Sequence, residues 1–163
     1  MRTLFVTDPP PPVEDWLAHR HALGQDRFDE VWEGEYHVAP APHWRHARVE
    51  DEVAAVLRPL AAHAGLHGGG PCSIGTAEDY RVPNRAYLRA DDGQLWNPTA
   101  AIVVEIVSPG DESRRKLDFY GRAGIEELLV VDPDERTVEW FIRGPETSSR
   151  RTAAGSWPSR APR

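Results

Sequence analysis

One glutamate stands out because it lies inside an apolar run. Glu105 occupies the segment 101–107, in which every other residue is alanine, valine or isoleucine. Such a run is typical of a central strand that is covered on both faces, and strand alternation places Glu105 on the same side as Val103 and Val107. Burial of an unpaired carboxylate is costly, so Glu105 must be ion-paired, protonated or bound to a cation. We interpret it as the centre of a functional site; the alternative is a structural ion pair with an arginine.

Asn84 shows a related pattern. In the segment 82–88, alternation puts Asn84 on one face with Val82, Ala86 and Leu88. The functional interpretation is a neutral oxygen ligand, which would hold a hard cation more weakly than a carboxylate does. The alternative is an asparagine that is hydrogen-bonded within the core or a turn.

Three further polar residues could converge on the same pocket. Lys116 comes early in the helix predicted after Glu105, and a short loop between them would let its amine return toward the carboxylate. An ammonium there could orient an attacking water and stabilise negative charge at a scissile phosphate. Glu35 follows a predicted hairpin turn, and His46 begins a predicted helix. The alternatives are a solvated surface charge for Lys116 and an ordinary helix-end histidine for His46.

These residues need a mixed sheet with helices on both faces to position them. Turn and strand signals predict a β-hairpin over 27–39, with Glu33-Gly34 at its turn. Helical spacing of apolar residues predicts a helix over 46–64. The remaining predicted elements are a short N-terminal helix at 13–21, strands at 72–75, 80–88 and 100–107, a helix at 113–123, and strands at 127–131 and 137–142.

Length and composition favour one globular domain. The chain has 163 residues, of which 40% are hydrophobic. We expect a proline-rich segment with a short helix at 1–25, the main domain at 26–143 and a disordered basic tail at 144–163. The net charge of −7 argues against broad electrostatic adhesion to nucleic acid.

Cysteine usage and hydropathy bear on location. The single Cys72 excludes an internal disulfide and a thiolate zinc cluster, and favours a reducing compartment. No apolar run approaches the roughly 20 residues that cross a bilayer. We therefore expect a cytoplasmic protein that has no membrane partner.

Several motifs occur in a characteristic order. They are the hairpin Trp32-Glu33-Gly34-Glu35, the helix entrance Pro42-x-x-x-His46, Tyr80-Arg81-Val82-Pro83-Asn84, Val103-Val104-Glu105-Ile106-Val107-Ser108-Pro109, Lys116-x-x-x-Tyr120, and the run from Ala123 to Pro133. With these spacings, the chain resembles the Uma-type endonuclease family of the PD-(D/E)XK nuclease superfamily over roughly residues 26–143.

The resemblance implies an α/β (α+β) fold with a restriction-endonuclease-like core, and cleavage of DNA with Mg²⁺ or Mn²⁺. It implies that Glu105 is the second acidic metal ligand. Lys116 looks like the catalytic lysine moved onto the next helix, because Val107 occupies its usual place. Glu35 and His46 match the family's hairpin acid and helix-entrance histidine. Asn84 departs from the pattern, since the family has an aspartate there as its first metal ligand. Homodimers are common in the superfamily.

Three hypotheses therefore remain. The first is an active, Mg²⁺-dependent endodeoxyribonuclease. The second is a catalytically weakened nuclease fold that acts as a nucleic-acid-binding or regulatory module, because Asn84 replaces a charged ligand. The third is a structural or interaction protein whose buried Glu105 is only ion-paired.

Overall fold

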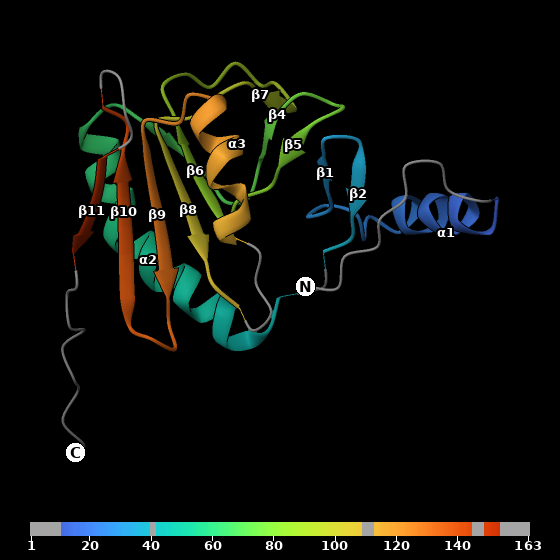
Figure 1. Ribbon diagram of the computed structural model, residues 1–163, viewed down its shortest axis with the longest axis horizontal. Helices are drawn as coiled ribbons and strands as arrows, with labels where there is room; N and C mark the ends of the chain where they lie inside the picture. Colours follow the sequence, from blue (N-terminus) through green and yellow to red (C-terminus); the bar gives the residue numbers. More distant parts are fainter. Residues whose placement is uncertain (1–10, 40–41, 109–112, 145–148, 154–163) are drawn as a thin grey trace.

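A six-stranded mixed sheet forms the framework of the molecule (Figure 1). The computed structural model describes residues 11–39, 42–108, 113–144 and 149–153. The strand order of this larger sheet is β11-β10-β9-β8-β6-β3, and β8 and β9 run parallel at its centre while the other pairs are antiparallel. Its strands are β3 (His67–Gly68), β6 (Arg85–Leu88), β8 (Ile102–Ile106), β9 (Glu127–Asp132), β10 (Thr137–Ile142) and β11 (Ser149–Ala153).

Two helices cover opposite faces of the larger sheet. Figure 1 shows α3 (Leu117–Arg122) in front of the sheet and the long α2 (Trp44–His63) behind it. Phe119 and Tyr120 of α3 pack in one core cluster with residues of β8 and β9, whereas Val53 of α2 packs in a second cluster. Strand β8 is therefore covered on both faces, and this explains why its residues form a continuous apolar run. Val103 packs in the first cluster, whereas Val104 and Ile106 pack in the second.

A smaller sheet lies beside the larger one. Its strand order is β2-β1-β5-β4-β7. The strands are β1 (Glu30–Trp32), β2 (Glu35–His37), β4 (Ser73–Gly75), β5 (Tyr80–Arg81) and β7 (Trp96–Asn97). At the β1–β2 turn both Glu33 and Gly34 have positive φ, of 52° and 89°, as a two-residue hairpin turn requires. Helix α1 (Pro11–Ala22) lies beyond this hairpin, and Arg20 joins it to Asp29 at 2.9 Å.

The predicted mixed fold is confirmed, but the strand expected at 80–88 is divided. Tyr80–Arg81 belongs to the smaller sheet as β5, and Arg85–Leu88 belongs to the larger sheet as β6. Pro83 lies between them, and proline has no N–H to donate to a strand ladder. Asn84 therefore lies at the crossing between the sheets rather than within a strand.

Two other segments differ from expectation. The helix expected over 113–123 begins as a 3₁₀ turn, Ser113–Lys116, before α3 follows. Residues 149–153, predicted to lie in a disordered tail, form β11 along β10. The rest of that tail, 145–148 and 154–163, is outside the described residues. Among the helices of the described residues, none has both the length and the apolar character needed to span a membrane.

Candidate functional site

Glu105 lies in the interior of β8, with 3% of its surface exposed. Its Oε1 atom accepts hydrogen bonds from Lys116 Nζ at 3.0 Å and from Tyr120 Oη at 2.5 Å. Both donors come from the 3₁₀ turn and α3 that follow β8 in sequence. The predicted return of Lys116 toward the carboxylate is therefore present, and the charged partner of Glu105 is a lysine rather than an arginine.

Lys116 also contacts a second carboxylate. Its Nζ lies 2.7 Å from Glu30 Oε1, and the Lys116 side chain is only 4% exposed. The other donors to Glu30 are the backbone N–H of Val82, at 2.7 Å from Oε1, and Trp32 Nε1, at 2.6 Å from Oε2. Lys116 thus lies between one carboxylate from each sheet, and both oxygens of Glu30 already accept protein donors.

Burial and charge set the protonation of this cluster. Burial raises the pKa of Glu105 to about 7, although the adjacent Lys116 ammonium opposes that shift. Burial by itself would lower the pKa of Lys116, but the carboxylates of Glu105 and Glu30 outweigh it and raise this pKa. Burial, together with Glu105, raises the pKa of Tyr120, which keeps the phenol protonated. Near neutral pH, Lys116 is therefore charged, and Glu105 is present in both its protonated and its ionised form.

Asn84 connects the β8 backbone to the start of α2. Its Oδ1 accepts the backbone N–H of Ile106 at 2.7 Å, and its Nδ2 lies 2.6 Å from His46 Nε2. Since the amide oxygen faces a donor, the amide nitrogen must face His46, and Nε2 of the imidazole must accept. The ring proton is then on Nδ1, which lies 2.8 Å from Ser108 Oγ. Asn84 therefore fixes a neutral His46 tautomer in this network.

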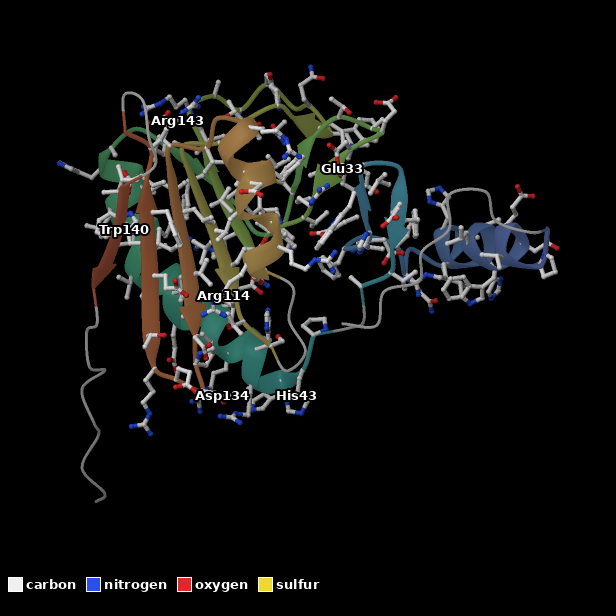
Figure 2. The ribbon with its side chains drawn as sticks, in the orientation of Figure 1. Glu33, His43, Arg114, Asp134, Trp140 and Arg143 are labelled. Atoms are coloured by element: carbon white, nitrogen blue, oxygen red, sulfur yellow. The ribbon has the colours of Figure 1, made fainter. Side chains whose placement is uncertain are left out.

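A cavity of about 770 Å³ brings these groups together. Its polar lining includes Glu30, His46, Asn84, Glu105 and Lys116. Of the predicted site residues, four are therefore brought to one cavity: Asn84, Glu105, Lys116 and His46. The cavity also reaches the molecular edge, where Figure 2 shows His43 and Asp134 close to the start of α2 and the β9–β10 turn.

Glu35, the fifth predicted residue, is not among those that line the cavity. It lies in β2, half-buried, opposite Trp32 of β1. The carboxylate that the hairpin contributes is that of Glu30, and Tyr120 is a second group that was not predicted as a site residue. Glu30 carried a weaker sequence signal than Glu105: strand-forming residues lie on both sides of it, but Asp29 directly precedes it, so it does not interrupt an apolar run.

Lys116 carried a compositional signal as well. It is the only lysine among the 19 lysine and arginine residues of the chain. A lysine presents a compact ammonium on a flexible stem, whereas an arginine presents a broad planar fork. The space between Glu30 and Glu105 therefore suits the one basic residue type that the rest of the chain does not use.

The cavity has two oxygen atoms suited to a divalent cation. Glu105 Oε2 accepts no hydrogen bond from the described residues, and the Asn84 amide oxygen has a second lone pair beside its bond to Ile106. The described residues contain no group of three or more histidine, cysteine, aspartate or glutamate side chains placed to hold a metal. Such a donor pair fits Mg²⁺, which commonly keeps several waters and takes one or two carboxylates together with substrate phosphates.

Comparison with known proteins agrees with this architecture. A crystal structure of "a putative nuclease belonging to DUF820" from Anabaena variabilis superposes with a TM-score of 0.63 at 17% identity, over 78% of this chain and 76% of that one. The two proteins therefore share a fold. No curated protein matches the chain significantly. The sequence profile of the Uma2 family, described as "Putative restriction endonuclease", matches residues 15–160. This chain belongs to the Uma2 family.

Proposed function

We propose that this protein is a metal-dependent endonuclease that hydrolyses DNA phosphodiester bonds at the cavity around Glu105 and Lys116. One observation carries the proposal: Glu105 presents to a cavity an oxygen that accepts no hydrogen bond from the part of the chain that the structure describes, while its other oxygen holds a lysine ammonium at 3.0 Å. Carboxylates and lysines are so combined where a cation and a reacting phosphate must be held together. Membership of the Uma2 family supports the same reaction.

In this proposal, Glu105 Oε2 and Asn84 Oδ1 would hold Mg²⁺ or Mn²⁺. When bound, the ion would polarise the phosphoryl oxygen and lower the pKa of a bound water. Lys116 stays protonated, and its ammonium would donate to the water or to the phosphate oxygens as negative charge develops there. Tyr120 holds Glu105 Oε1 by donating to it, which leaves Oε2 as the oxygen available to the ion.

The edge of the cavity supports a nucleic-acid substrate. Arg45 and Arg48 of α2 line it, as does Arg136 after β9. Arg45 pairs with Asp134 and Arg48 with Glu52, both at 3.5 Å and both largely exposed. Exposed pairs of this kind are weak, so a DNA phosphate can replace the carboxylate at either arginine. These arginines could position a DNA backbone despite the acidic charge of the whole chain.

A second candidate function is a weakened nuclease fold that binds nucleic acid without efficient cleavage. Asn84 favours it, because the amide brings no charge to a cation and is already engaged by Ile106 and His46. In the family pattern, an aspartate stands at this place. The replacement lowers the expected affinity for a hard cation.

Plasmid cleavage distinguishes the two candidates. Purified protein is incubated with supercoiled plasmid and Mg²⁺ or Mn²⁺, beside Glu105→Gln purified in the same way. Nicking that requires the cation and disappears in Glu105→Gln supports the endonuclease. Absence of nicking in the natural sequence, with nicking by Asn84→Asp, supports the weakened nuclease. Nicking of equal strength by Glu105→Gln contradicts the assignment of this site.

A further inference from the structure

Phe28 is an aromatic residue that faces the cavity instead of the core. It lines the cavity, and 39% of its surface is exposed. A single exposed apolar residue is ordinary on a protein surface. Phe28 differs because it lies two residues before Glu30, whose carboxylate contacts the Lys116 ammonium at 2.7 Å. Two residues span at most about 7 Å, so the backbone of Phe28 is close to that of Glu30.

The backbone around Phe28 is held in place by hydrogen bonds. Phe28 lies in a turn that the N–H of Asp29 closes by donating to the C=O of Asp26 at 3.0 Å. The Asp29 side chain is 1% exposed and accepts hydrogen bonds from Arg20 at 2.9 Å and from the N–H of Ala39 at 2.8 Å. The turn therefore fixes the position of Phe28, and the ring can bind a flat group at little cost in conformational entropy.

Part of the remaining lining suits a flat apolar ligand group better than a phosphate. Val49, Pro71 and Pro133 are among the apolar residues that line the cavity. Phosphate groups are bound by charges and hydrogen bonds, so they do not need such surfaces. The faces of nucleobases do, because every base has a π-face that stacks favourably on an aromatic ring. The cavity volume of about 770 Å³ is also typical of pockets that enclose small ligands, about 300–1,000 Å³.

The net charge gives a further reason to expect contacts to bases. The chain carries a charge of −7. Affinity for nucleic acid usually depends on neutralising phosphates with lysine and arginine, and an acidic chain gains less from this than a basic one. Within a duplex, the neighbouring base pairs cover each base face, so a protein ring reaches it only where the base has left the stack. A phenylalanine at this cavity therefore favours a strand that is not fully paired.

We infer that the Phe28 ring stacks on an unpaired base of the DNA strand that enters the cavity. The preferred substrate is then single-stranded DNA, or a duplex with an unpaired base, and Phe28 is a specificity-determining residue. This inference rests on the proposed function and names its substrate class. It is compatible with nicking of supercoiled plasmid, because negative supercoiling favours local separation of the two strands.

Three short DNA ligands separate base contacts from phosphate contacts. They are a labelled thymidine strand, the same strand paired with its complement, and a strand of equal length in which every nucleotide is abasic. The abasic strand keeps the phosphates and lacks the bases. Fluorescence anisotropy measures binding in EDTA and again with Mg²⁺ at 4 °C, where electrophoresis confirms that the DNA stays intact.

Two substitutions of Phe28 are compared with a matched control. Phe28→Leu keeps the apolar bulk but removes the flat ring, whereas Phe28→Trp keeps a ring that can stack. Trp140→Leu is the control, because Trp140 is similarly exposed, at 38%, and lies on β10 outside the cavity lining. Urea unfolding confirms that each variant is folded.

The ring should matter only where bases are accessible. We expect Phe28→Leu to bind the thymidine strand about tenfold more weakly, as for the loss of one base stack. Phe28→Trp should restore this affinity, and Trp140→Leu should leave it unchanged. Binding of the duplex should change by less than about twofold in Phe28→Leu, because its base faces are covered. The abasic strand should bind equally to Phe28→Leu and to the natural sequence.

The affinities of the natural sequence are decisive even if a variant does not fold. It must bind the thymidine strand more tightly than the abasic strand, and equal affinities overturn the inference. An unchanged affinity of Phe28→Leu for the thymidine strand overturns it as well, and so does an equal loss for all three ligands. A loss confined to the thymidine strand, with recovery in Phe28→Trp, supports it.

The plasmid assay separates this inference from the proposed function. If the stacking results are negative but nicking requires both the cation and Glu105, the proposed function stands and only the stacking site is lost. If single-strand binding depends on Phe28 but neither the natural sequence nor Asn84→Asp nicks plasmid, the stacking site stands and the endonuclease is contradicted. If no DNA binds and no plasmid is nicked, both are overturned.

Discussion

Glu30 and Glu105 reach the same ammonium group from two different sheets. Glu30 belongs to β1 of the smaller sheet and Glu105 to β8 of the larger sheet, and one oxygen of each lies within 3.0 Å of Lys116 Nζ. The contact therefore joins the two sheets and also builds the candidate active site. For this reason, substitutions here affect stability and site chemistry together, unless they keep the hydrogen bonds in place.

Lys116→Met is expected to destabilise the protein strongly. It removes the ammonium that Glu30 and Glu105 share and leaves two buried carboxylates facing each other. Removing one member of a buried ion pair typically costs about 3–5 kcal/mol. Urea unfolding at pH 8 measures the loss. The double variant Lys116→Met with Glu105→Gln should recover part of it, because one of the two charges is then absent. A loss below 1 kcal/mol, small for any buried charge, would contradict the importance of the shared ammonium.

Glu105→Gln should change how stability depends on pH. The folded pKa of Glu105, about 7, is above its ordinary value of 4.5, so the folded state holds this proton more tightly than the unfolded state does. Its contribution to stability is therefore full below about pH 4.5 and is lost as pH rises through about 7. Glutamine removes this loss. Relative to the natural sequence, the variant should gain up to about 3 kcal/mol between pH 5 and pH 8. The free energy of unfolding of both proteins is measured by urea unfolding at a series of pH values in cation-free buffer. If the two proteins show the same pH dependence, the raised pKa of Glu105 is contradicted.

Glu30→Gln should be more harmful to stability than Glu105→Gln at pH 8. Both oxygens of Glu30 accept protein donors, so a glutamine amide must turn its NH₂ group toward one of them. At position 105, glutamine can keep its oxygen toward Lys116 and Tyr120 and put the NH₂ group where no described donor lies. An unmatched buried polar group costs about 1–3 kcal/mol.

Glu35→Gln is the matched control for that comparison. Glu35 lies on the same hairpin as Glu30 but does not line the cavity. Glu35 is only half-buried and lies outside the cavity lining, so its substitution should change the free energy of unfolding by about 0.5 kcal/mol or less. Equal destabilisation by Glu30→Gln and Glu105→Gln would contradict the inference that Glu30 needs both of its oxygens as acceptors and Glu105 only one.

Asn84→Asp should change the proton position on His46. In the natural sequence, the Asn84 NH₂ group faces Nε2, so the imidazole proton is on Nδ1. An aspartate oxygen at the same place accepts a proton, and the ring should then carry one on Nε2. Nitrogen-15 chemical shifts of the His46 ring distinguish the two forms. His19, on α1 and outside the cavity lining, serves as the internal reference. An unchanged Nε2 shift in the variant would show that the amide does not set the tautomer.

Part of the site could be predicted because it depends on local sequence. Glu105 is an acid within an apolar strand, and the side on which it lies follows from alternation along β8. Lys116 follows after a short connection, so its return to Glu105 needs only one reversal of the chain. His46 was predicted at the start of the helix, and it lies in the first turn of α2.

Other parts depend on which strands are neighbours. Glu30 and Glu35 lie on one hairpin with similar sequence surroundings, and only the pairing of β1 with β5 decides that Glu30 is the one near Lys116. The strand predicted through Asn84 gave no sign that β5 and β6 belong to different sheets. Pro83 was a possible breaker, but proline alone does not say where the chain goes next.

By itself, the sequence determined the class of fold, the buried acid at its centre and the family to which the chain belongs, because these follow from short-range periodicity and from motifs in a set order. Only the tertiary structure decided that Lys116 is shared by two carboxylates, that Asn84 is held by Ile106 and His46, and that Glu30 takes the place expected for Glu35. The physical reason is that a hydrogen bond between distant residues depends on the register and packing of whole strands, which no local pattern of side chains encodes.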